Sequence, residues 1–434
     1  MHNDCEAFRT ALYQSGNGYS TFANYGWEMG NQYPTSTIVT TSQFQTIKNY
    51  TIAYYSGHGA RGTYPVINAG SNQTINVATA LGVDSNNWQS SCIVKPTHPL
   101  RTVVLASCYQ LDSSVAKYYA RLMKASKVRA VAGYHDIAPS DGDVTIAQRF
   151  VASANVGDSV LEAWRYANNN IGWNWAVLVF NHPDGIDYEM PGFPNHAEPT
   201  IPSTTAVHRY ATFLANGHQE VVTTSSQPDI TTQIMSMPLT IFAVENRTRV
   251  AIPTTYNRDM AITNTSVLDN SDAVDNALVE IFGESLSNKI RVHHYVKREE
   301  VDEDVGVLSE TAVIQDHSYD YFDTYNGVKI ADSYIGATVD CQGVRDIRDN
   351  RKVVVSAGTT MVQLRANVSQ IITKESAIAV AQEARKCGNA CELYNVALAY
   401  APTGNGEYAL CYEVMMACGF CYVNVLTGEV VEFV

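Results

Sequence analysis

The sequence has few charged residues and no basic cluster, which excludes some classes of partner. Only 17% of its 434 residues are charged, and the formal net charge is −14. Because nucleic-acid binding depends on clustered Lys and Arg that displace counterions, no nucleic-acid partner is expected. No window reaches the about 18 consecutive apolar residues that a membrane-spanning helix needs, so no membrane span is expected either.

The cysteines are distributed unevenly along the chain. Of nine cysteines, six lie in the last hundred residues, Cys5 and Cys92 lie near the start, and Cys108 stands apart. Pairing within each group would leave Cys108 as the single free thiol. This usage predicts disulfides and a secreted or cell-surface protein. The first residues, MHNDCEAF, lack the regions of a signal peptide, so the protein is either cytosolic or begins here at a mature terminus, and the cysteine usage favours the second interpretation.

A zinc site is the alternative use of the C-terminal cysteines. Cys387 and Cys391 are spaced as C-x3-C, and Cys418 and Cys421 as C-x2-C. These spacings suit tetrahedral zinc, but an oxidising compartment favours disulfides. We therefore expect neither a metal nor another cofactor.

The length of the chain predicts two domains or three. The Pro-rich stretch 190–202 interrupts every periodic pattern and is interpreted as the main linker. We expect a first domain over 1–200, a connecting region over 201–300 that belongs with the second module, and a C-terminal domain over 301–434.

The first domain reads as α/β, with a mainly parallel sheet and flanking helices. Apolar runs rich in β-branched residues alternate with helical patterns. Strands are predicted at 50–55, 102–106, 128–132 and 176–180, and helices at 113–125, 144–154 and 159–168. Asp112 is the expected N-cap of the first of these helices.

The last third predicts a smaller α+β domain. Residues 321–339 read as two strands joined at Asn326-Gly327, a strong hairpin signal. An amphipathic helix is predicted over 374–386, followed by strands at 408–415 and 422–425 and a last strand after Thr427-Gly428.

Two strand ends in the first domain carry reactive side chains. YYSGHG places His58 after one strand, and VVLASC places Cys108 after the next. Because groups at the carboxyl ends of adjacent parallel strands face one crevice, these two residues can meet. An imidazole can accept the thiol proton and later protonate a leaving amine. The backbone N–H groups of Gly59 and Cys108 are the candidate oxyanion-hole donors.

These motifs resemble the caspase-like superfamily, which includes clostripain, gingipains, legumain and separase. A His-Gly pair follows one hydrophobic strand, and a Cys preceded by a small residue follows the next, about fifty residues later. Ala106-Ser107-Cys108 departs from the caspase Gln-Ala-Cys-Arg-Gly, which argues against cleavage after Asp. The resemblance covers about residues 20–182 and implies a caspase-like fold and cysteine-peptidase activity through a Cys-His dyad.

The loop after the next strand is where related peptidases form the primary specificity pocket. His135, Asp136, Asp141 and Asp143 lie there. A carboxylate in this pocket would favour Arg or Lys before the scissile bond. The competing interpretation is that these are ordinary solvated turn residues.

The C-terminal part resembles the propeptide of thermolysin-type metallopeptidases, including its PepSY module. The similarity rests on YFDTYNGVKIADSYIGATVDCQGVRDIRDN, ITKESAIAVAQEA and YVNVLTGEVVEF, although the HExxH motif is missing. It implies that this module controls the peptidase as an intramolecular inhibitor or in a chaperone-like way, and a module that only adds stability is the equal alternative. The sequence thus predicts a secreted cysteine endopeptidase that acts on peptide or protein substrates. The alternative is a non-catalytic binding or adaptor protein on the same scaffold.

Overall fold

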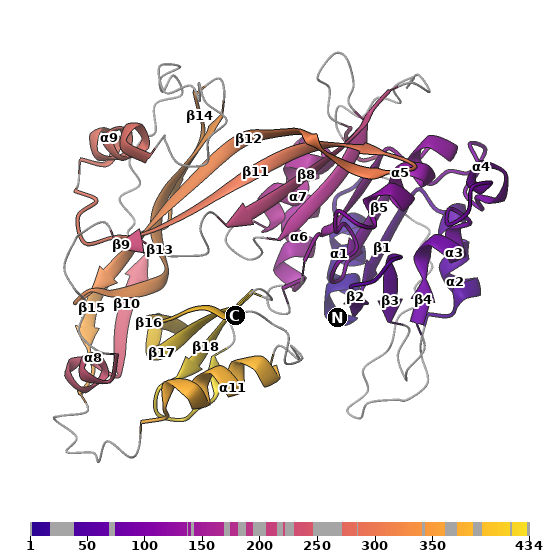
Figure 1. The fold of residues 1–434 in the computed structure, drawn as a ribbon. Helices are drawn as coiled ribbons and strands as arrows, with labels where there is room; N and C mark the ends of the chain where they lie inside the picture. The colour runs from indigo at the N-terminus through magenta and orange to yellow at the C-terminus, as the bar shows by residue number, and fades with distance from the viewer. Residues whose placement is uncertain are drawn as a thin grey trace. The chain divides into compact units, whose positions relative to one another are not determined.

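The computed structural model of the chain describes residues 2–17, 39–68, 74–136, 138–139, 143–168, 174–180, 188–193, 205–214, 220–221, 230–245, 271–283, 285–340, 343–360, 371–384, 393–416 and 419–431. It is a mixed α/β structure with a large mixed sheet and flanking helices (Figure 1). The chain forms two compact units: Met1–Thr212 with Lys297–Val313, and Phe213–Val296 with Ile314–Val434. Among the described residues, no helix has the length and apolar character to cross a membrane.

The first unit alternates helices with strands. Its elements are α1 (His2–Gln14), α2 (Thr41–Gln45), η1 (Thr46–Asn49), β1 (Ile52–Ser56), β2 (Gly59–Ala60), β3 (Val66–Asn68), β4 (Thr74–Asn76), α3 (Val77–Leu81), α4 (Trp88–Ser91), β5 (Thr102–Ala106), α5 (Ala116–Ala125), β6 (Ala130–Tyr134), α6 (Asp143–Asn155), α7 (Val160–Asn168), β7 (Trp175–Phe180) and most of β8 (Val207–Leu214).

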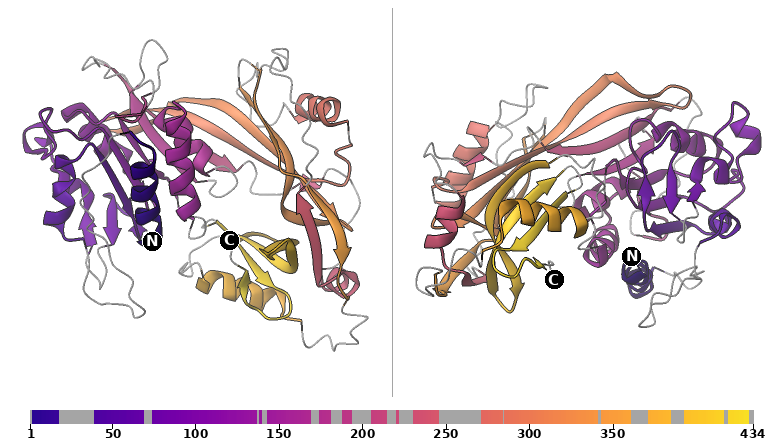
Figure 2. Two further views of the ribbon diagram at one scale, coloured as in Figure 1. Left: turned by 180° about the vertical axis from the view of Figure 1, so that it is seen from behind. Right: turned by 60° about the horizontal axis from the view of Figure 1, so that its bottom comes forward.

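The sheet of the first unit has the order β1-β5-β6-β7-β8. β1, β5 and β6 are parallel, whereas β7 is antiparallel to both β6 and β8. All residues of β5 and β6 are buried, as expected for apolar strands that are covered on both faces. α1 lies beside α6 in both views, with Phe8 stacked on Phe150 (Figures 1 and 2). The three short strands β2, β3 and β4 form a separate antiparallel sheet.

The predicted elements of the first domain are confirmed with small shifts at their ends. The largest shift is at α5, which begins at Ala116 rather than at residue 113. The Asp112 carboxylate accepts hydrogen bonds from Ser114 N, at 2.9 Å, and from Ser114 Oγ, at 2.6 Å. It therefore closes a turn ahead of the helix instead of capping the first helical residue.

The second unit is built mainly from strands. Its elements are β9 (Glu220–Val221), α8 (Ile230–Ser236), β10 (Thr240–Glu245), α9 (Ser271–Phe282), β13 (Val328–Asp340), β14 (Gly343–Asp349), β15 (Lys352–Ala357), α11 (Lys374–Ala384), β16 (Leu393–Gly404), β17 (Glu407–Met416), β18 (Gly419–Asn424) and β19 (Val430–Val431). The long strands β11 (Ile290–Asp302) and β12 (Gly306–Tyr325) belong partly to each unit.

The predicted hairpin at Asn326-Gly327 is confirmed. Tyr325 pairs with Val328, and the two residues between them have φ angles of 51° and 82°. Both angles are positive, as a two-residue type I′ turn requires. The helix α9 packs its apolar residues Val274, Leu278 and Phe282 into the same core as side chains of β12 and β13.

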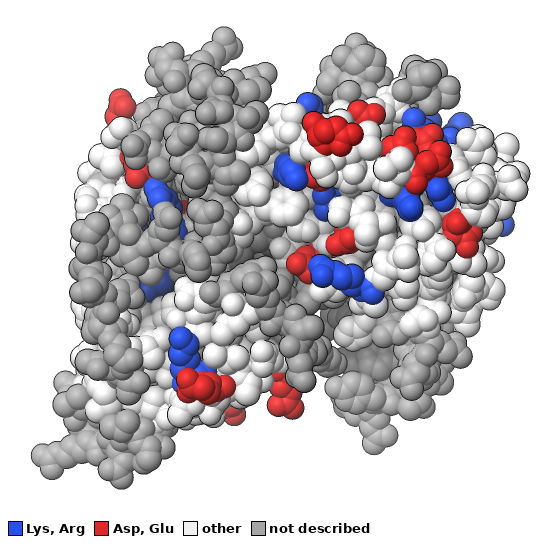
Figure 3. Space-filling view, in the orientation of Figure 1, with Lys and Arg blue, Asp and Glu red and all other residues white. Residues whose placement is uncertain are grey.

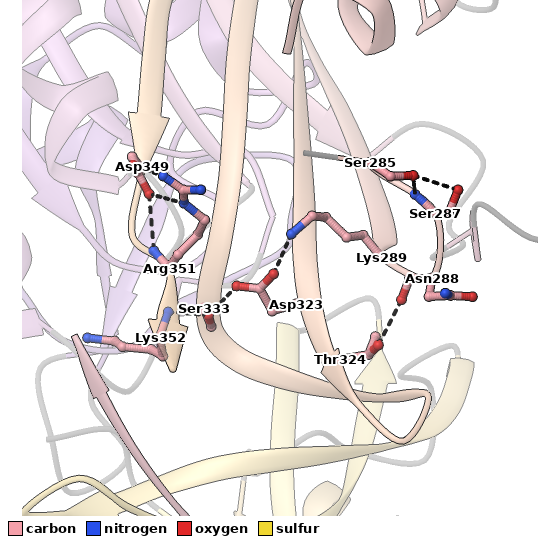
Figure 4. A network of polar contacts seen from close by, with 10 residues as sticks. All are labelled: Ser285, Ser287, Asn288, Lys289, Asp323, Thr324, Ser333, Asp349, Arg351 and Lys352. Atoms are coloured by element: carbon pink, nitrogen blue, oxygen red, sulfur yellow. Dashed lines mark hydrogen bonds and ion pairs between the residues drawn. The ribbon is translucent and has the colours of Figure 1, made fainter. Parts of the chain in front are cut away.

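A polar network ties four segments of the second unit together (Figure 4). Lys289 forms an ion pair with Asp323 of β12. Ser333 of β13 donates to the other carboxylate oxygen of Asp323 at 2.5 Å and accepts from the backbone N–H of Lys352 at 2.6 Å. The network fixes the starts of β11 and β15 against the β12–β13 pair.

The unit division differs from the boundaries expected at residues 200 and 300. The segment Lys297–Val313 belongs to the first unit, because the strand order continues from β8 to β11 and β12. Residues 301–313 were expected in the C-terminal domain. Pairing between strands so distant in sequence leaves no local pattern, which explains the difference.

The expected cysteine pairing is wrong for two described residues. Cys92 and Cys411 are buried free thiols. Cys92 Sγ–H donates to Val94 O at 3.3 Å, so this thiol is a packed core group rather than half of a disulfide with Cys5. Cys341, Cys387, Cys391 and Cys418, including three of the four alternative zinc ligands, lie outside the described residues.

On the face drawn in Figure 3, the charged side chains that the structure describes form no basic stripe. The Lys and Arg residues that the structure describes there alternate with Asp and Glu.

Candidate active site

The register of two parallel strands brings His58 and Cys108 to the same edge of the sheet. Ser56 of β1 pairs with Ala106 of β5, and Gly57 N–H donates to Ala106 O at 3.4 Å. His58 and Cys108 each lie two residues beyond the last pair. His58 is exposed and Cys108 is half-buried, so neither residue is sealed in the core. Their placement at one edge was predicted from the two strand ends.

The sulfur of Cys108 lies among backbone N–H groups. Ala138 N–H donates to Cys108 Sγ at 3.3 Å, and the N–H groups of Gly59 and of Cys108 itself also interact with this sulfur. Burial raises the pKa of the Cys108 thiol above its ordinary value, the amide donors lower it, and the negative charge of Asp136 raises it. Burial is the largest of these effects, so the resting group at neutral pH is a thiol held by donors that would also stabilise a thiolate.

Gly59 makes a close backbone contact with the cysteine loop, the segment 107–115 that follows β5. A β-carbon at Gly59 would overlap the carbonyl oxygen of Cys108 and lie 2.8 Å from Gln110 Nε2. Only glycine allows this approach. The same contact brings the Gly59 N–H group to the sulfur.

Gln110 holds the cysteine loop in place through buried hydrogen bonds. Its side chain is fully buried, and its Nε2 group donates to Val66 O at 2.9 Å and to Cys108 O at 3.1 Å. Tyr119 of α5 donates its hydroxyl to Gln110 Oε1 at 2.9 Å. This side chain therefore connects β3, the Cys108 peptide and α5.

Tyr109, the residue after Cys108, adopts a left-handed backbone with φ of 59°. A non-glycine residue in this conformation carries strain of about 1–3 kcal/mol and needs support from its surroundings. Tyr109 N–H donates to Asp136 O at 2.9 Å, and the tyrosine hydroxyl bonds to the Asp136 carboxylate. The guanidinium of Arg61 lies 4.7 Å from the centre of the tyrosine ring.

The four residues predicted to bind substrate have different placements. Asp136 is half-buried at the end of β6, close enough for its charge to act on Cys108. His135 Nε2 lies 2.7 Å from Thr212 O. Because a carbonyl oxygen can only accept a hydrogen bond, Nε2 carries the proton and donates it. Burial and then the charge of Arg209 lower the pKa of His135 to about 3. The neutral imidazole of His135 is therefore hydrogen-bonded to β8.

The structure describes less of the other two residues predicted to bind substrate. Asp141 lies outside the described residues, and Asp143 is the first residue of α6, with its side chain not described. The contributions of Ala138, Tyr109 and Gln110 to the site were not predicted from the sequence. A backbone donor and a positive φ angle leave no sequence signal, whereas a buried glutamine two residues after the cysteine could have been noticed.

Comparisons with known proteins add little to this geometry. No protein-family model matches the chain, and no curated protein matches it. Among solved structures, the chain is similar to the Bacillus megaterium YpeB C-terminal domain, with 12% sequence identity and a TM-score of 0.20. The match covers 39% of this chain and 97% of that one. A similarity at this TM-score carries no argument about fold or function.

Proposed function

We propose that this protein is a cysteine endopeptidase in which Cys108 is the nucleophile and His58 its acid-base partner. One observation carries the proposal: the two residues leave adjacent parallel strands in register, and backbone N–H groups surround the sulfur. A thiol at a strand end is usually an inert core group. Here the thiol is half-buried, lies at the same sheet edge as the exposed His58, and contacts a glycine that no other residue could replace.

In the proposed mechanism, His58 accepts the thiol proton as Cys108 Sγ attacks the peptide carbonyl. The tetrahedral oxyanion is stabilised by the N–H groups of Gly59 and Cys108. As this intermediate collapses, the carbon–nitrogen bond breaks and His58 gives its proton to the departing amine, leaving a thioester. Water then attacks the thioester with His58 as base, which releases the carboxylic acid and restores the thiol. No cofactor takes part.

We further propose that Asp136 favours Arg or Lys before the scissile bond. The observation that supports this is that a half-buried carboxylate acts electrostatically on Cys108. A cationic substrate side chain would pair with it through charge-assisted hydrogen bonds. The strand-rich second unit is proposed as a regulatory module of this secreted or cell-surface enzyme.

A non-catalytic binding protein on a caspase-like scaffold is the second candidate. One observation favours it: burial raises the pKa of Cys108 above the ordinary value, whereas many catalytic thiols have a lowered pKa. The two candidates differ in the reactivity of this one sulfur toward a substrate-like electrophile.

The deciding experiment treats the full chain with a peptidyl acyloxymethyl ketone that carries Arg next to the reactive group. An enzyme is expected to show saturable labelling mapped to Cys108, and Cys108→Ala is expected to remove both labelling and peptide hydrolysis with an unchanged unfolding midpoint. The buried thiol Cys92 is the internal control and should stay unlabelled. Labelling of Cys108 that does not saturate, or hydrolysis retained by Cys108→Ala, contradicts the proposal.

A further inference from the structure

Arg209 joins the cysteine loop to a segment almost two hundred residues further along the chain. It lies on β8 and is only 3% exposed. Its Nε–H group donates to Leu111 O at 2.9 Å, and its Nη1 group forms an ion pair with Glu299 Oε2 at 2.5 Å. All three residues belong to the first unit.

Leu111 is held from two directions. Its N–H group donates to Tyr134 O of β6 at 2.9 Å, while its carbonyl accepts from Arg209. Tyr109 N–H makes the neighbouring bond to Asp136 O. One side of the cysteine loop is therefore fixed by β6, and the Leu111 carbonyl is held by the Arg209 guanidinium.

Glu299 lies in the β11–β12 hairpin, Lys297–Val313, which makes further contacts with the same region. Arg121 of α5 donates from Nε to Glu303 O at 2.5 Å and approaches Asp304 Oδ1 at 3.4 Å. A β-carbon at Gly306 would lie 3.6 Å from Ser113 O, so the turn of the hairpin reaches the end of the cysteine loop.

Charge explains why Arg209 needs the hairpin. A buried guanidinium without a counter-ion is strongly unfavourable, and burial lowers the pKa of Arg209 while the Glu299 carboxylate raises it. Both members are almost fully buried, and the second oxygen of Glu299 pairs with Lys297 at 2.7 Å. Glu299 thus neutralises Arg209 and leaves its Nε–H group directed at the loop.

We infer that the β11–β12 hairpin is a positioning clasp for the nucleophile: through Glu299 and Arg209 it fixes the loop that places the Cys108 sulfur. Arg209 and Glu299 are positioning residues, because neither acts on substrate. The inference rests on the proposed function for its catalytic consequence. Val305 at the turn of the hairpin is 74% exposed, so the turn is accessible from solvent. Displacement or cleavage of the hairpin there would release the cysteine loop and lower the reactivity of Cys108.

The test compares three variants of the full chain with the wild type. Arg209→Lys keeps a positive charge opposite Glu299 but lacks an Nε–H group for Leu111 O. Arg209→Met/Glu299→Leu removes the pair together, a replacement that buried ion pairs usually tolerate without loss of stability. Glu310→Gln changes an exposed carboxylate in the same hairpin and is the matched control. The readouts are kinact and KI for the acyloxymethyl ketone, and hydrogen exchange of the Tyr109 and Leu111 amides.

The clasp predicts that both Arg209 variants lower kinact by at least about tenfold with KI within about threefold, because misplacement affects the reacting atoms more than binding. Exchange at the two amides should become faster, and Glu310→Gln should behave like the wild type. Wild-type kinact and exchange in a folded double variant overturn the clasp. If the wild type itself shows no saturable labelling, the peptidase proposal fails, and exchange alone decides: faster exchange supports the clasp, unchanged exchange refutes it.

Discussion

The α-carbon of Gly59 packs directly against the carbonyl group of Cys108, leaving no space for a side chain between the two strand ends. The contact has two consequences. It fixes the residue after His58 relative to the candidate nucleophile, and it brings the Gly59 N–H group to Cys108 Sγ. The Gly57–His58–Gly59 segment is therefore shaped by the cysteine loop, and a change at residue 59 tests this relationship.

Gly59→Ala is expected to lower the rate of Cys108 labelling by at least about a hundredfold, comparable to the loss of an oxyanion donor. The added methyl group must displace the Cys108 peptide, so unfolding free energy should fall by about 1–3 kcal/mol. Gly62→Ala is the matched control, because the nearest atom to a β-carbon there is 3.6 Å away. Equal labelling rates for the two variants would show that the close approach is irrelevant to reactivity.

Gln110→Leu is expected to destabilise the first unit and to slow labelling. The substitution leaves Val66 O and Cys108 O without this donor and Tyr119 Oη without its acceptor. Each buried polar group left unsatisfied costs about 1–3 kcal/mol, so a total loss of at least about 2 kcal/mol is expected from denaturant unfolding. Gln89→Leu, at an exposed position, should leave stability within about 0.5 kcal/mol of the wild type. A small effect for Gln110→Leu would mean that water replaces the lost bonds.

Asp136→Asn separates charge from hydrogen bonding at the proposed specificity site. Asparagine keeps an acceptor for the Tyr109 hydroxyl, which contacts the Asp136 carboxylate, but it removes the negative charge. The value of kcat/KM for substrates with Arg or Lys before the cut should fall by at least about tenfold, because a charge-assisted pair is lost. Substrates with a neutral residue at that position are the control. A preference for basic residues that survives the substitution would place the selector elsewhere.

The fold of both units could be predicted where local patterns dominate. The strand at 102–106 has the predicted ends, because a short run of β-branched and apolar residues, TVVLA, lies between a polar residue and a turn. The hairpin at Asn326-Gly327 was predictable because both residues tolerate positive φ. The assignment of Lys297–Val313 to the first unit could not be predicted. Glu299 of this segment pairs with Arg209, which is distant in sequence, and buried ion pairs have no periodic signature.

The candidate site could be predicted only as far as side chains at strand ends reveal it. His58 and Cys108 follow apolar runs, and parallel pairing then brings them to one edge. The amide of Ala138 and the left-handed backbone of Tyr109 depend on loop conformation, which no residue type there specifies. His135 was predicted to bind substrate because it lies in the loop after β6, but its ring is hydrogen-bonded to Thr212 O.

The second unit contains a buried ion pair whose loss should be costly. Lys329 and Glu413 are 3% and 1% exposed at their side chains, and Tyr422 donates its hydroxyl to Glu413 Oε1 at 2.9 Å. Glu413→Gln leaves the Lys329 ammonium buried without a counter-ion and should lower unfolding free energy by about 3–5 kcal/mol. Burial already lowers the pKa of Lys329, and Glu413 opposes this effect.

Two comparisons test the ion pair by denaturant unfolding. Lys329→Met/Glu413→Leu removes both charges and should be more stable than Glu413→Gln, with a remaining loss of about 1–3 kcal/mol because the buried Tyr422 hydroxyl loses its acceptor. Glu407→Gln, at an exposed position on the same strand, should change little. If Glu413→Gln were as stable as Glu407→Gln, Lys329 would have to be neutral in the folded protein.

A histidine pair on β11 and β12 should make the second unit sensitive to acid. His293 Nε2 and His317 Nδ1 are 2.9 Å apart, and the His293 ring stacks on Tyr319 with centroids 4.3 Å apart. Burial lowers the pKa of His293 to about 3, with His317 and Arg291 adding to the effect. Burial also lowers the pKa of His317 to about 4.

Because both pKa values are depressed on folding, the unfolded chain binds more protons than the folded one between pH 6.5 and 4. The stabilisation is therefore complete above pH 6.5 and is lost as the pH falls toward 4, at up to about 1.4 kcal/mol per pH unit for each histidine. The pair titrates as a coupled unit, so its two steps belong to both residues. His293→Phe/His317→Phe should flatten this dependence in urea unfolding followed by far-UV circular dichroism, with the two proteins compared at pH 7.5 and pH 5. The wild type loses more stability over this range than the variant if the pair is responsible, and equal losses would assign the acid sensitivity to other buried groups, such as His135 and His208.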